Sequence, residues 1–96
     1  MNAMTFEQRM IPPLVGLAHK LLDAGLFGYI EPIGNFLVAV KSGRWRQLPD
    51  DEKNYWLDRL GTTLGPRGLG DSWDRNDPDY KEIGELVYNE LKVLRR

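Results

Sequence analysis

The side chains best suited to bind a ligand form two short clusters, and the first combines positive charge with an aromatic ring. Lys41, Arg44, Trp45 and Arg46 bring three cations and an indole together within six residues. Because cations neutralise phosphates and an indole stacks on bases, this composition is typical of a nucleic-acid or phosphate-binding surface. In the alternative interpretation, Trp45 packs between two helices while the basic side chains cover apolar surface. The chain has no wider basic field around the cluster, so we favour the packing interpretation.

The second cluster lies in a stretch rich in glycine and charge, residues 65–77, which we expect to be a long surface loop. Trp73 stands there among charged residues, where neither a helical nor a strand period requires a large apolar side chain. Tryptophan and arginine are over-represented at protein-binding hot spots, and Arg67 and Arg75 share this loop. Arg67, Trp73 and Arg75 are therefore our candidate partner-binding residues. The alternative is that Trp73 packs onto the core and holds the loop in place.

No set of residues in the chain matches a catalytic or cofactor-binding pattern. The absence of cysteine excludes disulfides, thiolate metal sites and cysteine nucleophiles. His19 is the only histidine, and Asp23, the carboxylate at helical spacing from it, predicts an ordinary pair on a helix surface. We therefore expect a non-enzymatic protein that uses neither a metal ion nor a cofactor.

Two segments suggest ligand-binding loops but fail in their details. The glycine-rich segment 61–70 suggests a phosphate-binding loop, yet no Lys-Ser or Lys-Thr follows its last glycine and no clear strand precedes it. The acidic residues from Asp71 to Asp79 suggest a calcium loop, but a register that starts at Asp74 places Pro78 where a carboxylate is needed. We therefore interpret 61–70 as helix termination and turns, and the acidic run as a solvated loop that ends in a helix cap.

The best-defined element is a helix over 78–95, around which we expect the rest of the chain to pack. Asp77 is suited to the N-cap and Pro78 to the first helical position. Apolar residues then recur at spacings of three and four, and the charges follow the helix dipole, acidic first and basic last. Gly84 costs such a helix about 1 kcal/mol relative to alanine. Close approach of another helix, from this chain or from a second subunit, would explain its presence.

The remaining pattern predicts a mainly α fold, a compact single-domain bundle of about four helices. Helices are expected near 13–24, 31–42, 49–63 and 78–95. The predicted core consists of Leu14, Ala18, Leu21, Phe36, Leu37, Val40, Trp56, Leu57, Leu60, Ile83, Val87, Leu91 and Leu94.

Two parts of this fold prediction have alternatives. Residues 1–12 are expected to form a flexible N-terminal arm and 13–96 the globular domain, because Pro12-Pro13 disfavours a helix that runs through them. Thr5 and Gln8 could still cap a short first turn within the arm. The alternative fold is α+β, with a β-hairpin over 36–48 in place of a helix.

Composition and charge narrow the function classes. With a net charge of −1, the chain lacks the field of a non-specific polyanion binder. No apolar run comes near the length of about 20 residues that spans a bilayer. We therefore expect a soluble, cytoplasmic protein whose function is protein–protein interaction, as an accessory subunit, adaptor or inhibitor. Its partner would be another protein or a second copy of the chain, with no membrane involved, and nucleic-acid binding through the basic cluster is the alternative function.

Overall fold

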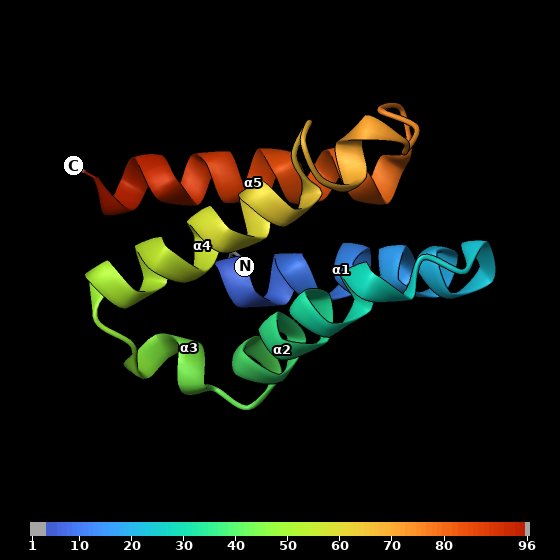
Figure 1. The fold of residues 1–96 in the computed structure, drawn as a ribbon. Helices are drawn as coiled ribbons and strands as arrows, with labels where there is room; N and C mark the ends of the chain where they lie inside the picture. The colour runs from blue at the N-terminus through green and yellow to red at the C-terminus, as the bar shows by residue number, and fades with distance from the viewer. Residues whose placement is uncertain (1–3, 96) are drawn as a thin grey trace.

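Five α-helices and two short 3-10 turns make up most of the described part of the chain, residues 4–95 of the computed structural model (Figure 1). The helices are α1 (Phe6–Ala24), α2 (Ile30–Lys41), α3 (Arg44–Gln47), α4 (Asp50–Leu64) and α5 (Pro78–Leu94). The turns are η1 (Phe27–Tyr29) and η2 (Leu69–Asp71). The prediction of a mainly α, single-domain bundle is confirmed. The helices expected at 31–42, 49–63 and 78–95 agree with α2, α4 and α5 to within one residue at each end.

The predicted alternative of a hairpin over 36–48 is wrong, because the described residues contain no strand. This segment comprises the end of α2, a turn at Ser42-Gly43 and the short helix α3. Ile33, Phe36 and Val40 follow the helical period, and all three are buried. Gly43 has φ of 82°, a left-handed conformation that glycine adopts without steric cost, and this turns the chain from α2 into α3.

The first helix begins at Phe6, well before the predicted start, so the expected arm over 1–12 is wrong from that residue onward. Thr5 and Gln8 form a capping box, in which the Gln8 amide donates to Thr5 Oγ1 at 3.2 Å and the Thr5 amide donates to Gln8 Oε1 at 3.0 Å. The helix then continues through both prolines of the Pro12-Pro13 pair. Residues 1–3 of the expected arm lie outside the described part of the chain.

Tertiary packing explains why α1 passes through two prolines that would interrupt an isolated helix. Met10 and Leu14, on either side of the prolines, are both fully buried. The ring of Phe6, at the start of the helix, lies 5.6 Å from that of Trp45. Burying these apolar side chains offsets the lost helical hydrogen bonds. Packing with residues distant in sequence thus overrides a local rule.

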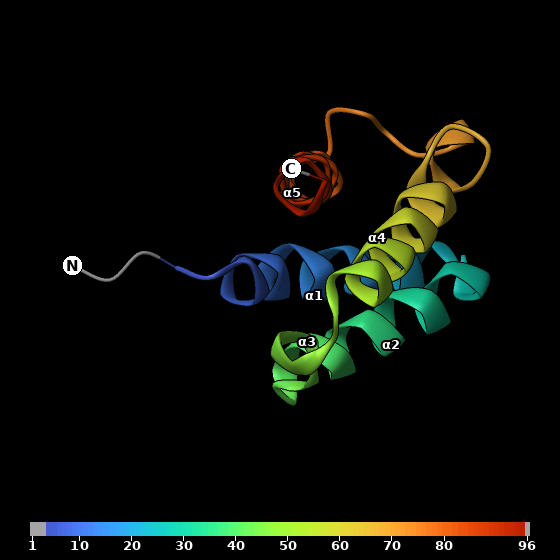
Figure 2. The same cartoon turned by 90° about the vertical axis from the view of Figure 1, so that its left-hand side faces the viewer.

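The core surrounds α1, which packs against α2 and α5, while α4 contacts both of these helices (Figure 2). Of the predicted core residues, those that are buried are Leu14, Leu21, Phe36, Val40, Leu57, Leu60, Ile83 and Val87. Those that lie half-buried against the core are Ala18, Leu37, Trp56, Leu91 and Leu94. The buried residues that the prediction missed include Met10, Leu17, Ile33, Trp45, Leu64 and Leu69.

The start of α5 is fixed by Asp77, which is the N-cap that the sequence predicts. Its Oδ1 accepts hydrogen bonds from the amides of Asp79 at 3.0 Å and Tyr80 at 3.1 Å. Lys20 of α1 donates to both carboxylate oxygens, at 3.0 and 2.8 Å. Partial burial tends to raise the pKa of Asp77, but the hydrogen bonds from Lys20 and the two amides outweigh it and hold this pKa below its ordinary value. The chain that leaves α4 therefore returns to the bundle at a defined point.

Candidate functional site

An apolar groove runs between α4 and α5, and it is termed the α4–α5 groove below. It comprises two adjoining cavities of about 280 and 460 Å³, which share Gly61, Gly65 and Leu91. Its buried floor is formed by Leu60, Leu64, Ile83 and Val87. Beyond Leu91 the groove continues along the last turns of α5 as a hollow that reaches Lys92 and Arg95. Above this buried floor, the groove exposes Gly61, Gly84 and Tyr88 to solvent.

The groove is open because α4 and α5 carry small residues where they line it. Gly61 lies inside α4 and Gly84 inside α5, and a Cβ atom built on either would meet no atom within 4 Å. Neither position has a positive φ, so neither backbone conformation requires glycine. Each glycine nevertheless costs its helix about 1 kcal/mol relative to alanine. The fold itself therefore does not require glycine at either position, and both glycines leave helix backbone uncovered in the groove.

Unlike Gly61 and Gly84, two glycines in the loop after α4 have no room for a side chain. A Cβ atom on Gly68 would lie 2.1 Å from the carbonyl oxygen of Thr63, and one on Gly70 would lie 2.6 Å from the hydroxyl of Tyr80. The same hydroxyl donates a hydrogen bond to the carbonyl of Leu64, which ties the first turn of α5 to the last residue of α4. One end of the groove is closed by this tight packing.

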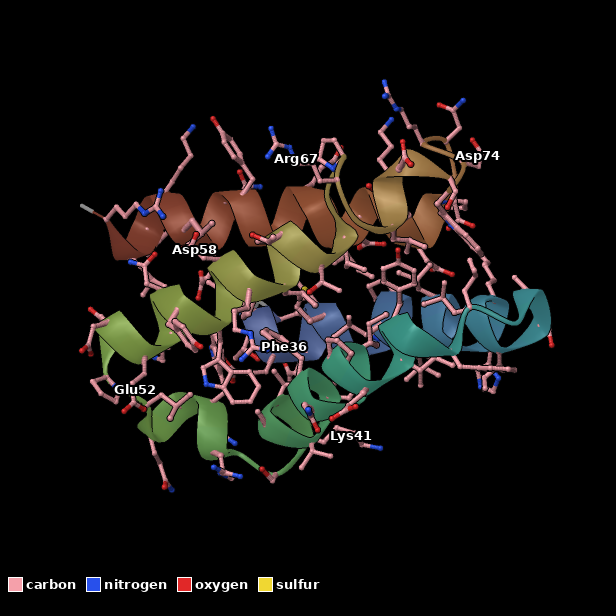
Figure 3. The ribbon with its side chains drawn as sticks, in the orientation of Figure 1. Phe36, Lys41, Glu52, Asp58, Arg67 and Asp74 are labelled. Carbon is pink, nitrogen blue, oxygen red and sulfur yellow. The ribbon has the colours of Figure 1, made fainter. Side chains whose placement is uncertain are left out.

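Charged side chains border the groove, and Figure 3 shows Asp58 on α4 and Arg67 on the loop that follows it. Asp58 is paired with Arg95, whose Nη2 donates to Oδ1 at 3.1 Å. The Lys92 ammonium lies 4.9 Å from the centre of the Tyr88 ring. Neither Arg67 nor Lys92 takes part in an ion pair with any residue that the structure describes. The border of the groove therefore carries two positive charges without a counter-charge.

Of the three predicted partner-binding residues, Arg67 lines the groove. Trp73 is half-buried against the core, and its Nε1 atom is buried without a hydrogen-bond partner among residues 4–95. Arg75 is exposed in the turn before α5 and does not line the groove. The structure thus places Trp73 as the packing interpretation expects, and the three residues do not form one surface in the groove.

The predicted nucleic-acid cluster is divided between core and surface, and its aromatic member lies in the core. Trp45 is 1% exposed, with the rings of Phe6 and Phe36 at 5.6 and 5.1 Å from its own. Stacking on a base would require this indole to leave its contacts with both rings. Trp45 therefore packs in the core, as the favoured interpretation of the sequence expects, and the alternative stacking role is wrong.

The basic members of that cluster remain on the surface. Lys41, Arg44 and Arg46 are exposed, and Arg46 Nε lies 3.7 Å from a carboxylate oxygen of Glu7. Figure 3 shows Lys41 on the opposite edge of the molecule from Arg67. Without an exposed aromatic ring from Trp45, these cations form a small charged surface that is separate from the groove.

A second cleft, of about 300 Å³, lies between α2 and α4. Its inner wall includes Phe36 and Trp56, whose ring centres are 6.3 Å apart. Exposed charges of opposite sign border it, Glu31 on α2 and Arg59 on α4. The border of this cleft therefore carries no net charge.

Two further observations concern metal ions and membranes. Within the described range, no three His, Cys, Asp or Glu side chains are grouped so that they could hold a metal ion, and His19 is exposed on α1. No helix in that range combines the length and the apolar content needed to cross a membrane.

The sequence interpretation missed the groove because it considered Gly61 and Gly65 only as residues that could end the helix over 49–63. The helix in fact ends at Leu64 with Gly65 as its C-cap, so Gly61 lies one turn inside α4. Gly61 and Gly65, spaced by four residues at the end of α4, together with the isolated Gly84 in α5, are the signal that could have indicated a bare helix surface.

Comparison of the chain with protein-family models, with curated proteins and with solved structures gives no match. The geometry and charge of the groove are therefore the observations that indicate a function.

Proposed function

We propose that this protein is a non-enzymatic protein-interaction module that binds an amphipathic helix of a partner protein in the α4–α5 groove. The observation that carries the proposal is a continuous apolar groove with a floor of core residues and bare backbone at Gly61 and Gly84. An isolated domain gains nothing from bare helix backbone at these positions, whereas a docked helix can approach it closely.

The form of the groove favours a helical occupant over an extended one. An extended peptide usually adds to a sheet edge, and the described residues contain no strand. From Tyr80 to Leu91 the α5 wall extends over about 16 Å, at a rise of about 1.5 Å per residue. A docked helix of about three turns matches this length, and its apolar residues at i, i+3 or i+4, and i+7 would enter the two cavities.

The test begins with peptides selected for binding to the intact chain from a library of displayed helices. We expect selected peptides to lose about tenfold or more in affinity when Gly61→Leu or Gly84→Leu fills the groove. Gly34→Leu is the matched control, because Gly34 lies inside α2 and a Cβ atom built on it also meets nothing within 4 Å. NMR shifts on peptide binding should be concentrated at Gly61, Gly84 and Tyr88.

Three results would contradict the proposal. Shifts concentrated outside the groove, or equal losses in all three leucine variants, would show that the groove is not the binding surface. A dimer in sedimentation that Gly84→Leu dissociates would identify a second copy of the chain as the occupant in place of a partner protein.

A further inference from the structure

We infer that the helix bound in the α4–α5 groove is acidic on its solvent-facing sides; this inference rests on the proposed function and adds the chemistry of the partner. It follows from the charges that border the groove and its continuation along α5. Asp58 is the one acidic residue lining these three adjoining hollows. Its carboxylate is already paired with Arg95, with Nη2 at 3.1 and 3.3 Å from the two oxygens.

Two cations, one bordering the cavity beside α4 and one bordering the hollow along the end of α5, remain without a counter-charge. Arg67 comes from the loop after α4 and Lys92 from α5, and neither is paired within residues 4–95. The ring of Tyr88, 4.9 Å from the Lys92 ammonium, favours a position of that charge close to the groove. A helix that lies in the groove and extends into the hollow at the end of α5 therefore lies near both positive charges.

This positive border is a local property, because the whole chain has a net charge of −1. An overall field of that size would not attract an acidic partner, so any preference for one must come from the residues around the groove. Charges at the border of an interface act on orientation, partner choice and association rate more than on the final affinity. We therefore expect a moderate, salt-sensitive preference for acidic helices.

The experiment uses two fluorescent peptides, stapled to keep them helical, with the same leucine positions on the apolar face. One peptide carries glutamate and the other lysine at every solvent-facing position. We expect the glutamate peptide to bind the intact protein about tenfold more tightly at low salt, and this difference to shrink at high salt. The double variant Arg67→Glu and Lys92→Glu should reverse the preference.

A matched control is Lys41→Glu with Arg44→Glu, which makes the same change in net charge on exposed residues outside the groove. It should leave the preference for the glutamate peptide unchanged. Equal binding of the two peptides, tighter binding of the lysine peptide, or an equal effect of both double variants would overturn the charge inference while leaving the groove as a binding site. Failure of both peptides to bind would instead overturn the proposed function. The difference in affinity between the two peptides for the unmodified protein tests the charge inference even if a variant does not fold.

Discussion

The ammonium of Lys20 lies 2.8 Å from Oδ2 of Asp77 and 3.0 Å from Oδ2 of Asp79, so one side chain in α1 holds two carboxylates at the start of α5. Gly16, one turn earlier in α1, leaves room for Asp79, whose Oδ2 would lie 2.3 Å from a Cβ atom there. This contact fixes where the chain returns after the loop. It thereby sets the position of α5 relative to α1, and with it one wall of the α4–α5 groove.

Replacing Asp77 should separate its capping role from its charge. Asp77→Ala removes the acceptor for two backbone amides, and we expect a loss of about 1 kcal/mol in the free energy of unfolding. Asp77→Asn keeps an acceptor oxygen but loses the charge that attracts Lys20, so its stability should lie between those of Asp77→Ala and the unmodified protein. Urea denaturation at neutral pH measures the stabilities of the two variants and the unmodified protein. Asp71→Ala, at an exposed residue, is the control. If Asp77→Ala matched the control, the cap would not contribute.

The Lys20 contact should be lost at both extremes of pH. The pKa of Asp77 lies below its ordinary value of 3.8, so its contribution is present above that value and disappears as the pH falls through the lowered pKa. Hydrogen bonds to Asp77 and Asp79 raise the pKa of Lys20 above 10.5, so its contribution is present below that value and disappears as the pH rises through the raised pKa.

Lys20→Met should therefore lower the thermal midpoint near neutral pH and approach the unmodified protein in strong acid and strong base. Thermal unfolding monitored by circular dichroism across the pH range checks this. Lys81→Met, at an exposed residue outside the ion pairs among residues 4–95, should show no such dependence. If the thermal midpoint of Lys20→Met were lower than that of the unmodified protein by the same amount at every pH, packing of the lysine stem, and not its charge, would stabilise the fold.

Ionisation of Glu90 changes the stability of the fold in the opposite direction to ionisation of Asp77. Burial raises the pKa of Glu90 above 4.5; attraction by Lys53 opposes this shift, and repulsion from Glu7 and Asp50 reinforces it. The folded state thus keeps this proton to a higher pH than the unfolded state, and stability falls as the pH rises through that interval. Glu90→Gln should raise the urea midpoint at neutral pH, and the gain should vanish below pH 4.5. Glu85→Gln, exposed on the same helix, is the control, and a destabilised Glu90→Gln would show that the carboxylate is needed.

Much of the bundle could be predicted from local signals. Asp77, Pro78 and the helical period identify α5 to within one residue, because capping and amphipathicity act within the helix itself. The first turns of α1 could not be predicted in the same way. Their stability depends on contacts such as Phe6 with Trp45, which join residues far apart in the sequence.

The candidate site was less accessible to sequence reasoning than the fold. Periodicity indicates which face of α4 and of α5 is apolar, but it does not indicate how far apart two packed helices lie. Arg67 was identified through its residue type, and the structure places it at the groove. Trp45 was assigned to a candidate surface on the same kind of reasoning, and the structure places it in the core. Residue type alone does not distinguish the two outcomes.

The glycines of the chain should fall into two groups when they are replaced by alanine. Gly61→Ala and Gly84→Ala fill empty space inside helices, so each should stabilise the protein by about 1 kcal/mol, a rise of roughly 4–8 °C in Tm. Gly34→Ala should behave similarly, because its position in α2 is equally open. Gly68→Ala should be destabilising, since its Cβ atom would lie 2.1 Å from the carbonyl oxygen of Thr63.

Differential scanning calorimetry of the four variants under one set of conditions separates these groups. A stability gain at both groove positions would show that folding alone does not require glycine there, as the binding proposal needs. If Gly61→Ala or Gly84→Ala instead lowered the Tm while Gly34→Ala raised it, α4 and α5 would pack more closely in solution than the groove allows. The leucine variants would then be expected to disturb the fold itself, and the groove would lose its place as the binding surface.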